Sequence, residues 1–391
     1  MSLKRARSNE DDNFNNAKKS KQDDANLQIH SLNCRNHSNF DKKFPHFRQP
    51  SEIGSFSLDI NRRFDHSDNQ LKAYVKPPNY DNVHFDLRQG YSTMIRKDES
   101  KKEYINDILK WILKNQAKFA LQSNRTDDLE KTKRQLYTDF ICWRGLLTKF
   151  LCTPYENREG WCVAITLYNG TYYLCEYDTE EKKQHTLNRT ERDEEMCCWG
   201  WKFEQYLTGD SPTSVPDTDK PYNNCEAFCT VVRSRLNTHS LVFSGEVDAV
   251  HTDTVQGKHY VEFKTCRDFT HPRQYTSFKR YKLIKWWAQS FLVGIPEIIC
   301  GYRDDDGIVH RLQSYNTQKL PDIAKDIPNT WRPNICFNFL DQLLSFIKSV
   351  VKTDDSSVVH LLEWSPGKPV ICSKPLHDSD YNFLPQWYTD V

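Results

Sequence analysis

"SGEVDAVHTDTVQGKHYVEFKT", residues 244–265, holds two short runs that alternate like β-strands but carry charged residues where a core face needs apolar ones. Side chains two residues apart on a strand point to the same face, so Glu246 and Asp248 share one face. Glu262 and Lys264 share a face for the same reason. The stretch therefore predicts three carboxylates and one lysine on a single patch.

A polar turn around Gln256-Gly257 would let the two runs return as neighbouring strands. Three clustered carboxylates repel one another and raise one another's pKa unless a cation neutralises them. Carboxylate oxygens are the ligands that Mg²⁺ and Mn²⁺ prefer. A lysine beside such a site can hold a phosphate oxygen or orient an attacking water, which is what phosphodiester hydrolysis requires in addition to the metal.

The alternative interpretation of this stretch is an exposed strand pair with surface ion pairs, which is common for isolated E-x-D or E-x-K patterns. Here both patterns occur in adjacent runs that also contain Val242, Phe243, Val247, Val261 and Phe263. Charged residues embedded in apolar sequence favour a functional site. E-x-D followed by E-x-K resembles the core of the PD-(D/E)XK nuclease superfamily.

The composition indicates a globular chain without a strongly charged surface. Only 37% of the 391 residues are hydrophobic, but 10 Trp, 19 Tyr and 21 Phe supply the bulk of a core. Lys plus Arg (54) nearly equal Asp plus Glu (53), so a nucleic-acid site must be a local patch. The 13 cysteines form no C-x-x-C pair, which favours unpaired thiols over a disulfide framework or a cysteine zinc site. Because no signal peptide and no apolar run of membrane-spanning length is found, no membrane association is expected.

The N-terminal segment differs in composition from the rest of the chain. Residues 1–40 are polar and poor in aromatics, which predicts a disordered tail before one folded domain at 41–391. The clusters Lys4-Arg5-Ala6-Arg7 and Lys18-Lys19-Ser20-Lys21 have the spacing of a bipartite nuclear-import signal. We expect a nuclear protein; a cytoplasmic pool is left open, and the alternative for the clusters is a solvated charged tail.

Hydrophobic periodicity and turn residues place the secondary-structure elements. An Asn169-Gly170 turn predicts a β-hairpin within residues 160–178. Helices are expected over residues 101–122, 280–296 and 334–351. Further strands are expected over residues 298–302 and 357–364. Mixed strands and helices without an internal repeat predict one α+β or α/β domain.

The sequences around the acidic runs are more specific than the acidic pattern itself. "NTHSLVFSGEVD", "YVEFKT", "TDFICWRGLLTKFLCTPYENREGW", "GWKFEQYL" and "KLIKWWAQSFLVGIPEIICGYRDDDG" resemble the DXO family of RNA decapping exoribonucleases. The resemblance extends from about Phe44 to the C-terminus. It implies an α+β fold, in which one domain has two mixed β-sheets flanked by helices around a PD-(D/E)XK-like core.

The resemblance also implies an activity. Family members are metal-dependent hydrolases of RNA 5′ ends: they remove incomplete caps, and many remove triphosphate or NAD-type ends. They also degrade 5′-monophosphate RNA in the 5′→3′ direction during mRNA quality control. The implied cofactor is Mg²⁺ or Mn²⁺, as two ions, and a larger nuclear 5′→3′ exoribonuclease is left open as a partner. Two alternatives are a catalytically silent relative that binds RNA ends and a DNA-directed PD-(D/E)XK nuclease; the first would be expected to lack metal ligands.

The family motifs carry over onto individual residues. The metal ligands they imply are Glu204, Glu246, Asp248, Glu262 and the main-chain oxygen of Phe263. The catalytic residues they imply are Glu246, Asp248, Glu262, Lys264 and Gln289. Gln289 would reach the scissile phosphate, and Lys264 would contact the same phosphate or the attacking water. The substrate-binding residues they imply are Arg62, Glu103, Trp143, Arg144, Gly145, Cys229, Glu246, Lys264 and Gln289. Within this set, Arg144 would hold a phosphate of the bound 5′ end.

Several of these residues have an ordinary structural interpretation as well. Arg144 alone would be a surface strand arginine, Arg62 and Glu103 would be solvated charges, and Cys229 would be a core thiol. The run "PRQYTSFKRYKLIK" is a candidate for the RNA path, and its alternative is the solvated face of a helix. Its basic residues are Arg273, Lys279, Arg280, Lys282 and Lys285.

Overall fold

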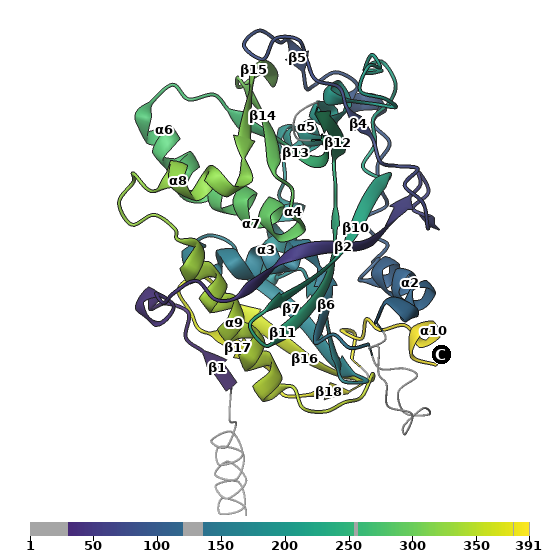
Figure 1. Ribbon diagram of the computed structural model, residues 1–391, viewed down its shortest axis with the longest axis vertical. Helices are drawn as coiled ribbons and strands as arrows, with labels where there is room; N and C mark the ends of the chain where they lie inside the picture. Colours follow the sequence, from purple (N-terminus) through teal and green to yellow (C-terminus); the bar gives the residue numbers. More distant parts are fainter. Residues whose placement is uncertain (1–29, 120–135, 254–256, 378, 391) are drawn as a thin grey trace, which may run out of the picture.

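Two mixed β-sheets organise the chain (Figure 1). The computed structural model describes residues 30–119, 136–253, 257–377 and 379–390. The larger sheet has eleven strands: in order β1 (His30–Leu32), β17 (Val370–Cys372), β16 (Val358–Trp364), β7 (Trp161–Tyr168), β8 (Thr171–Tyr177), β6 (Phe140–Trp143), β11 (His239–Glu246), β10 (Ala227–Leu236), β2 (Phe47–Leu58) and β3 (Phe64–Asp65), with β18 (Leu376–His377) paired to β16.

The smaller sheet has seven strands and occupies the upper part of Figure 1. Their order is β5 (Phe85–Asp86), β15 (Ile308–Asn316), β14 (Glu297–Arg303), β13 (Gly257–Arg267), β12 (Ala249–Asp253), β4 (Ala73–Tyr74) and β9 (Thr208–Gly209). In each sheet parallel pairs, such as β6 with β11 and β13 with β14, stand beside antiparallel ones.

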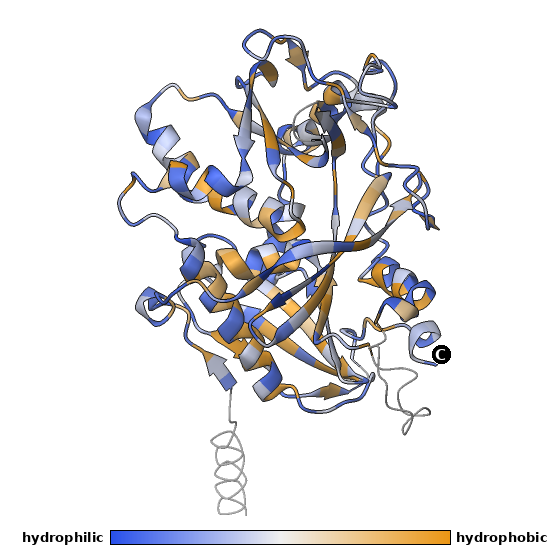
Figure 2. Ribbon diagram, viewed as in Figure 1, coloured by the Kyte–Doolittle hydropathy of each residue, from blue (hydrophilic) through white to orange (hydrophobic). Residues whose placement is uncertain are grey.

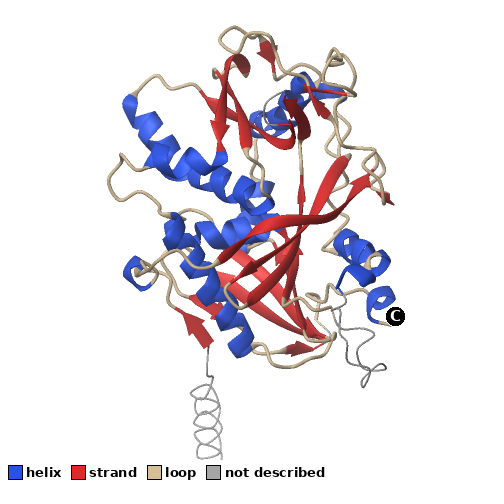
Figure 3. Cartoon of the chain, viewed as in Figure 1, coloured by secondary structure: helices blue, strands red, loops and turns tan. Residues whose placement is uncertain are grey.

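Helices flank both sheets (Figure 3). They are α2 (Asn106–Lys114), α3 (Arg144–Cys152), α4 (Glu180–Leu187), α5 (Glu191–Leu207), α6 (Pro272–Ser277), α7 (Leu283–Val293), α8 (Leu320–Ala324), α9 (Pro333–Val350) and α10 (Gln386–Thr389). Helix α3 packs against α7 and α9, and one hydrophobic cluster joins these helices to strands of both sheets. The α+β prediction with two mixed sheets is confirmed.

The hydrophobic pattern places the interior correctly. Figure 2 shows apolar residues running along the strands and along the helix faces turned toward them. The predicted hairpin is β7–β8, and its turn residues Asn169 and Gly170 have the positive φ values of 48° and 75° that a type I′ turn requires. Helix α7 ends where Gly294 takes a left-handed φ of 75°.

The predicted helix over residues 101–122 is shorter than expected. Tyr104 takes a left-handed φ of 49°, so α2 begins only at Asn106, and a short 3₁₀ turn at Gln116–Phe119 follows its end at Lys114. Apolar spacing alone does not show such an interruption. Residues 120–122 of the prediction lie outside the described residues.

The acidic stretch crosses from one sheet to the other. Glu246 is the last residue of β11 in the larger sheet, whereas β12 of the smaller sheet begins at Ala249. The prediction that Glu246 and Asp248 share one strand is therefore wrong, because Asp248 lies in the crossover. The prediction that the two runs return as neighbours is confirmed by the antiparallel pairing of β12 with β13. The turn residue Gln256 lies outside the described residues.

Sequence composition placed residues 1–40 in a tail, but the described chain begins within this range. Strand β1 pairs with β17, and Cys34 and Phe40 are buried. Residues 1–29, with both basic clusters, lie outside the described residues.

All 13 cysteines lie in the described part of the chain and are free thiols, twelve of them buried. Among the described helices, none is both long and apolar enough to cross a bilayer.

Candidate active site

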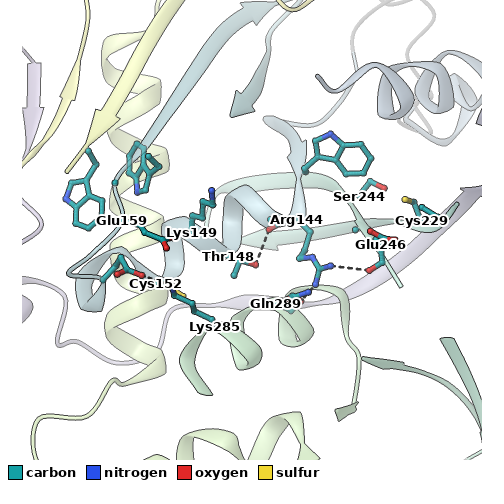
Figure 4. A pocket seen from close by; sticks show the side chains of 18 of the residues that line it. Arg144, Thr148, Lys149, Cys152, Glu159, Cys229, Ser244, Glu246, Lys285 and Gln289 are labelled. Carbon is teal, nitrogen blue, oxygen red and sulfur yellow. Dashed lines mark hydrogen bonds and ion pairs between the residues drawn. The ribbon is translucent and has the colours of Figure 1, made fainter. Parts of the chain in front are cut away.

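The predicted site residues gather around adjoining cavities where the two sheets meet. A cavity of about 510 Å³ lies between the start of α3, the end of β11 and α7 (Figure 4). Seven predicted residues line it: Arg62, Trp143, Arg144, Gly145, Cys229, Glu246 and Gln289. A second cavity of about 300 Å³ is lined by Glu204, Glu246 and Asp248. Glu246 therefore belongs to both cavities.

Glu262 on β13 is the buried centre of the site, with 2% of its surface exposed. Its Oε1 accepts hydrogen bonds from Nζ of Lys264 at 2.6 Å and from Nε2 of Gln289 at 2.5 Å. Nη1 of Arg144 lies 3.8 Å from its Oε2. Burying a carboxylate is costly unless hydrogen-bond donors or opposite charges compensate it. Here the compensating groups come from three elements, β13, α7 and α3.

Lys264 is held in its charged form by the neighbouring acids. Burial alone lowers the pKa of a lysine, but the carboxylates of Glu262 and Asp248 outweigh it and raise the pKa of Lys264 above its ordinary value. The site therefore presents an ammonium group beside the carboxylates.

The remaining acids are crowded by burial and by each other. Oδ2 of Asp248 accepts a hydrogen bond from the backbone N–H of Phe263 at 2.6 Å. Burial, followed by the Glu262 carboxylate, raises the pKa of Asp248 to about 8. Burial and the carboxylates of Asp248 and Glu246 raise the pKa of Glu204 well above its usual range. Burial, reinforced by the neighbouring carboxylates, outweighs the nearby lysine charges and favours the protonated forms of Asp248 and Glu204.

The acids present a donor set that fits a hard divalent cation. Oε2 of Glu262 is buried and has no hydrogen-bond partner. Carboxylate oxygens match Mg²⁺ or Mn²⁺, and a cation among them would counteract both the burial and the repulsion that raise the pKa of Asp248. The four carboxylates do not form a group of three with ligand atoms within 4.8 Å of one another in the described part of the chain, so side chains would have to rotate to bring three of them to one ion. The metal-ligand assignments, including the main-chain oxygen of Phe263, stay predictions.

Arg144 is a buried connector rather than a surface arginine. Only 6% of its surface is exposed, and it is the first residue of α3. Its Nη1 donates to the main-chain oxygen of Gln289 and its Nη2 to that of Glu246, both at 3.1 Å (Figure 4). Two of its five N–H groups are thereby engaged, and its predicted phosphate contact rests on the others.

Sequence reasoning missed Gly245, which makes room for this arginine. A Cβ atom there would lie 3.1 Å from Cβ of Arg144 and 3.1 Å from Cγ1 of Val293. The available signal was a glycine inside a strand pattern, which marks the close approach of another part of the chain.

The residues predicted to line the RNA path interact with one another. Nε and Nη2 of Arg62 donate to the two carboxylate oxygens of Glu103 at 2.9 Å and 2.7 Å, and Nζ of Lys97 donates to Glu103 at 2.6 Å. These residues are thus partly buried ion pairs rather than solvated charges. Glu103 lines a third cavity, of about 980 Å³, together with Arg62, Trp143 and Gly145.

Cys229 and Trp143 have structural contacts of their own. Cys229 is buried on β10 directly opposite Glu246, and burial raises the pKa of its thiol well above the usual value. Trp143 donates its indole N–H to the main-chain oxygen of Tyr104 at 2.8 Å. Gly145 faces open space, because a Cβ atom there would meet nothing within 4 Å.

The predicted basic run does not form one RNA-facing surface. Lys279 is buried and pairs with Asp326 at 2.7 Å, and Arg280 donates to the main-chain oxygen of Pro328. A π-helical turn at Phe278–Lys282 changes the phase of the side chains between α6 and α7, which α-helical spacing cannot show. Lys285 does line the 510 Å³ cavity, where it pairs with Glu156 at 2.8 Å.

Comparison with known proteins agrees with this geometry. The RAI1-like PD-(D/E)XK nuclease family matches residues 48–389. Human decapping and exoribonuclease protein is 41% identical over 354 residues, covering 89% of this chain and 86% of that protein. The Xenopus laevis protein of the same name is 39% identical over 363 residues, covering 90% and 88%.

Solved structures show the same fold. Candida albicans Rai1, crystallised with pU5 and Mn²⁺, superposes with a TM-score of 0.78 at 23% identity, covering 93% of this chain and 98% of that one. The match over nearly the whole folded region, with both acidic runs inside it, establishes that the chain belongs to the RAI1-like PD-(D/E)XK nuclease family.

Proposed function

We propose that this protein is a metal-dependent hydrolase of RNA 5′ ends that removes incomplete caps and triphosphate or NAD-type ends and degrades 5′-monophosphate RNA in the 5′→3′ direction. The observation that carries the proposal is the buried Glu262 carboxylate, on which Lys264, Gln289 and Arg144 converge. The names of the curated relatives support the same reaction class.

The residues around Glu262 have distinct tasks in such a reaction. Mg²⁺ or Mn²⁺ held by Glu204, Glu246, Asp248 and Glu262 would lower the pKa of the attacking water and shield the charge that develops on the phosphate. Lys264 and Gln289 already donate toward the Glu262 carboxylate, so they are placed to donate to a non-bridging phosphate oxygen beside it.

The shape of the 510 Å³ cavity fits a single-stranded end. Its wall contains the indole rings of Trp143, Trp161 and Trp364, next to the cationic groups of Arg144 and Lys285. Aromatic faces can stack on a nucleobase, and the cations can contact the phosphates that follow it. A duplex is too wide for such a cavity, so an unpaired 5′ end is the expected substrate.

The experiment uses four body-labelled RNAs that differ only in their 5′ end: monophosphate, triphosphate, unmethylated cap and NAD. We expect metal-dependent release of nucleotides or an end fragment, abolished by EDTA and by Asp248→Ala. Asp81→Ala, at an exposed aspartate that lines none of the three cavities described above, is the matched control and should retain full activity. Tight RNA binding without any product would favour the catalytically silent alternative.

We also propose that the protein acts in the nucleus, on the basis of the two basic clusters at residues 4–7 and 18–21. A fluorescent fusion should lose nuclear accumulation when both clusters are changed to alanine. A nuclear 5′→3′ exoribonuclease is the protein partner that this location and the family resemblance favour. Co-purification from nuclear extract, with and without RNase, tests that partner directly.

A further inference from the structure

A second group of possible metal ligands lies on the smaller sheet, apart from the carboxylate cluster. Nδ1 of His251 and Nε2 of His259 lie 2.9 Å and 3.3 Å from Oε2 of Glu297. The three ligand atoms are within 4.8 Å of one another, and no other such group was found among the described residues. The three residues come from neighbouring strands: β12, β13 and β14.

This group is on the opposite face of the sheet from the candidate active site. His259 and Glu262 are three residues apart on β13, so their side chains point to opposite faces. His251 and His259 are direct cross-strand partners, with ring centroids 5.1 Å apart, and the ring of Tyr74 packs against His251 on the same side. The group therefore lies on the other side of the sheet from the carboxylate cluster.

Its dimensions match a tetrahedral ion. Bonds of about 2.0–2.1 Å from Zn²⁺ to nitrogen or oxygen place ligand atoms about 3.3 Å apart. Two of the three separations are 2.9 Å and 3.3 Å, close to this value, and the third lies within 4.8 Å. Two imidazoles with one carboxylate suit Zn²⁺ and chemically similar ions and differ from the all-oxygen sets that Mg²⁺ prefers.

The hydrogen bonds around the group orient it for a cation. Nδ1 of His259 lies 3.3 Å from the main-chain oxygen of Gly257, so a neutral imidazole that donates there turns the lone pair of Nε2 toward Glu297. A lone pair facing an anionic oxygen at 3.3 Å needs either a second proton or a cation between them. A ring N–H donated to a backbone carbonyl is also what fixes metal-binding histidines elsewhere.

The hydrogen bonds around Glu297 favour the anionic form that a metal ligand needs. Its Oε1 accepts a hydrogen bond from Oγ of Ser314 at 2.6 Å, which leaves Oε2 for the two imidazoles. Although burial alone would raise it, the pKa of Glu297 is held below its ordinary value by hydrogen bonds from Ser314, His251 and His259. The side chains of the three ligands are between 10% and 20% exposed, which leaves access for an ion.

We propose that His251, His259 and Glu297 form a second cation site, for Zn²⁺ or a similar divalent ion, with a water as the fourth ligand. The ion would join β12, β13 and β14 on the reverse side of the strand that carries Glu262 and Lys264. It would stabilise the hairpin that presents the catalytic groups without taking part in hydrolysis.

The test uses tag-free, full-length protein with excess Mg²⁺, so that the carboxylate cluster is occupied. We expect one equivalent of Co²⁺ to give tetrahedral d–d absorption bands, and Zn²⁺ to displace it and raise Tm by several degrees. His259→Gln and Glu297→Gln should each lower Zn²⁺ affinity about 100-fold or more while circular dichroism stays native. His310→Gln is the matched control, because Nε2 of His310 also lies 2.9 Å from one carboxylate, that of Asp304.

Three outcomes would overturn the proposal. In the first, both ligand variants bind Co²⁺ and Zn²⁺ as tightly as the wild-type protein. In the second, binding is lost only in Glu262→Gln, which assigns the ion to the carboxylate cluster. In the third, the Co²⁺ spectrum shows only thiolate charge transfer that Cys197→Ser removes, which assigns it to the exposed cysteine. If His259→Gln fails to fold, Glu297→Gln and the Tm of wild-type protein with and without Zn²⁺ decide the matter.

Discussion

Nε2 of Gln289 donates a hydrogen bond to Oε1 of Glu262 over 2.5 Å, and this contact fixes helix α7 to strand β13 at the candidate active site. The main-chain oxygen of the same glutamine accepts a hydrogen bond from Arg144 on α3. Gln289 thus connects the larger-sheet side of the site with the strand that carries the central acid.

Gln289→Leu should lower kcat about 10- to 100-fold and should lower the free energy of unfolding by no more than the hydrogen bond that it removes. The substitution removes one hydrogen bond to a charged group, which contributes about 1.5–3 kcal/mol, while leucine preserves the packing of α7. Single-turnover hydrolysis of 5′-monophosphate RNA measures the effect. Gln318→Leu, at an exposed glutamine, should leave the rate unchanged. An unaltered rate in Gln289→Leu would remove this residue from the site.

Mg²⁺ binding should release protons below pH 8. Asp248 has a pKa of about 8 in the metal-free protein, so it is mostly protonated at pH 7 and must lose the proton to become a ligand. Mg²⁺ affinity should therefore rise with pH up to about pH 8 and then level off. Calorimetry in two buffers of different ionisation enthalpy measures the number of protons released. Glu103→Gln, outside the carboxylate cluster, should leave that number unchanged, whereas a pH-independent affinity would contradict the assignment.

The sequence predicted the patch around Glu262 because strand alternation is a local property. Glu262 and Lys264 share a face in any strand. The short turn before them predicts that the preceding strand pairs with theirs. The crossover between Glu246 and Asp248, in contrast, depends on the point where the chain changes sheets, which no local pattern marks. Strand alternation predicted that Glu246 and Asp248 meet, but by sharing a strand face, whereas the chain brings them to one cavity through the crossover.

Long-range contacts account for what sequence reasoning missed. His251, His259 and Glu297 come together only when β13 pairs in parallel with β14, a register that is set by the packing of both strands. The burial of Lys279 follows from the π-helical turn between α6 and α7. Arg62 and Glu103 are 41 residues apart, so their ion pair could not be predicted from the sequence around either residue.

Acid should destabilise the protein partly through Glu103. Burial alone would raise its pKa, but hydrogen bonds from Arg62 and Lys97 lower it to about 2. A depressed carboxylate pKa contributes stability that is complete above the unfolded value near 4.5 and is lost as the pH falls toward 2. Glu103→Gln should therefore cost on the order of 1–3 kcal/mol at neutral pH and less at pH 3.

Urea unfolding at both pH values measures this difference. Glu99→Gln, at an exposed neighbouring glutamate, should show no such pH dependence. An equal loss of stability for Glu103→Gln at pH 7 and pH 3 would mean that packing, rather than charge, explains the effect.

Two glycines beside Arg144 should respond oppositely to the same substitution. In Gly245→Ala the new methyl group lies 3.1 Å from Cβ of Arg144 and 3.1 Å from Cγ1 of Val293, so the arginine must shift. We expect a loss of about 1–3 kcal/mol in unfolding free energy, as for overpacked cores. Hydrolysis should fall as well, because Arg144 holds the main chain of Glu246 and Gln289.

Gly145→Ala provides the contrast. It lies inside α3, where a Cβ atom meets nothing within 4 Å, so alanine should leave the fold intact and raise the unfolding free energy by up to about 1 kcal/mol. Since the methyl group points into open space at a residue that lines the RNA-end cavity, KM for RNA should rise while stability is kept. Denaturant unfolding and steady-state kinetics on both variants separate the two effects. Equal destabilisation by both alanines would show that α3, rather than its contact with Gly245, limits stability here.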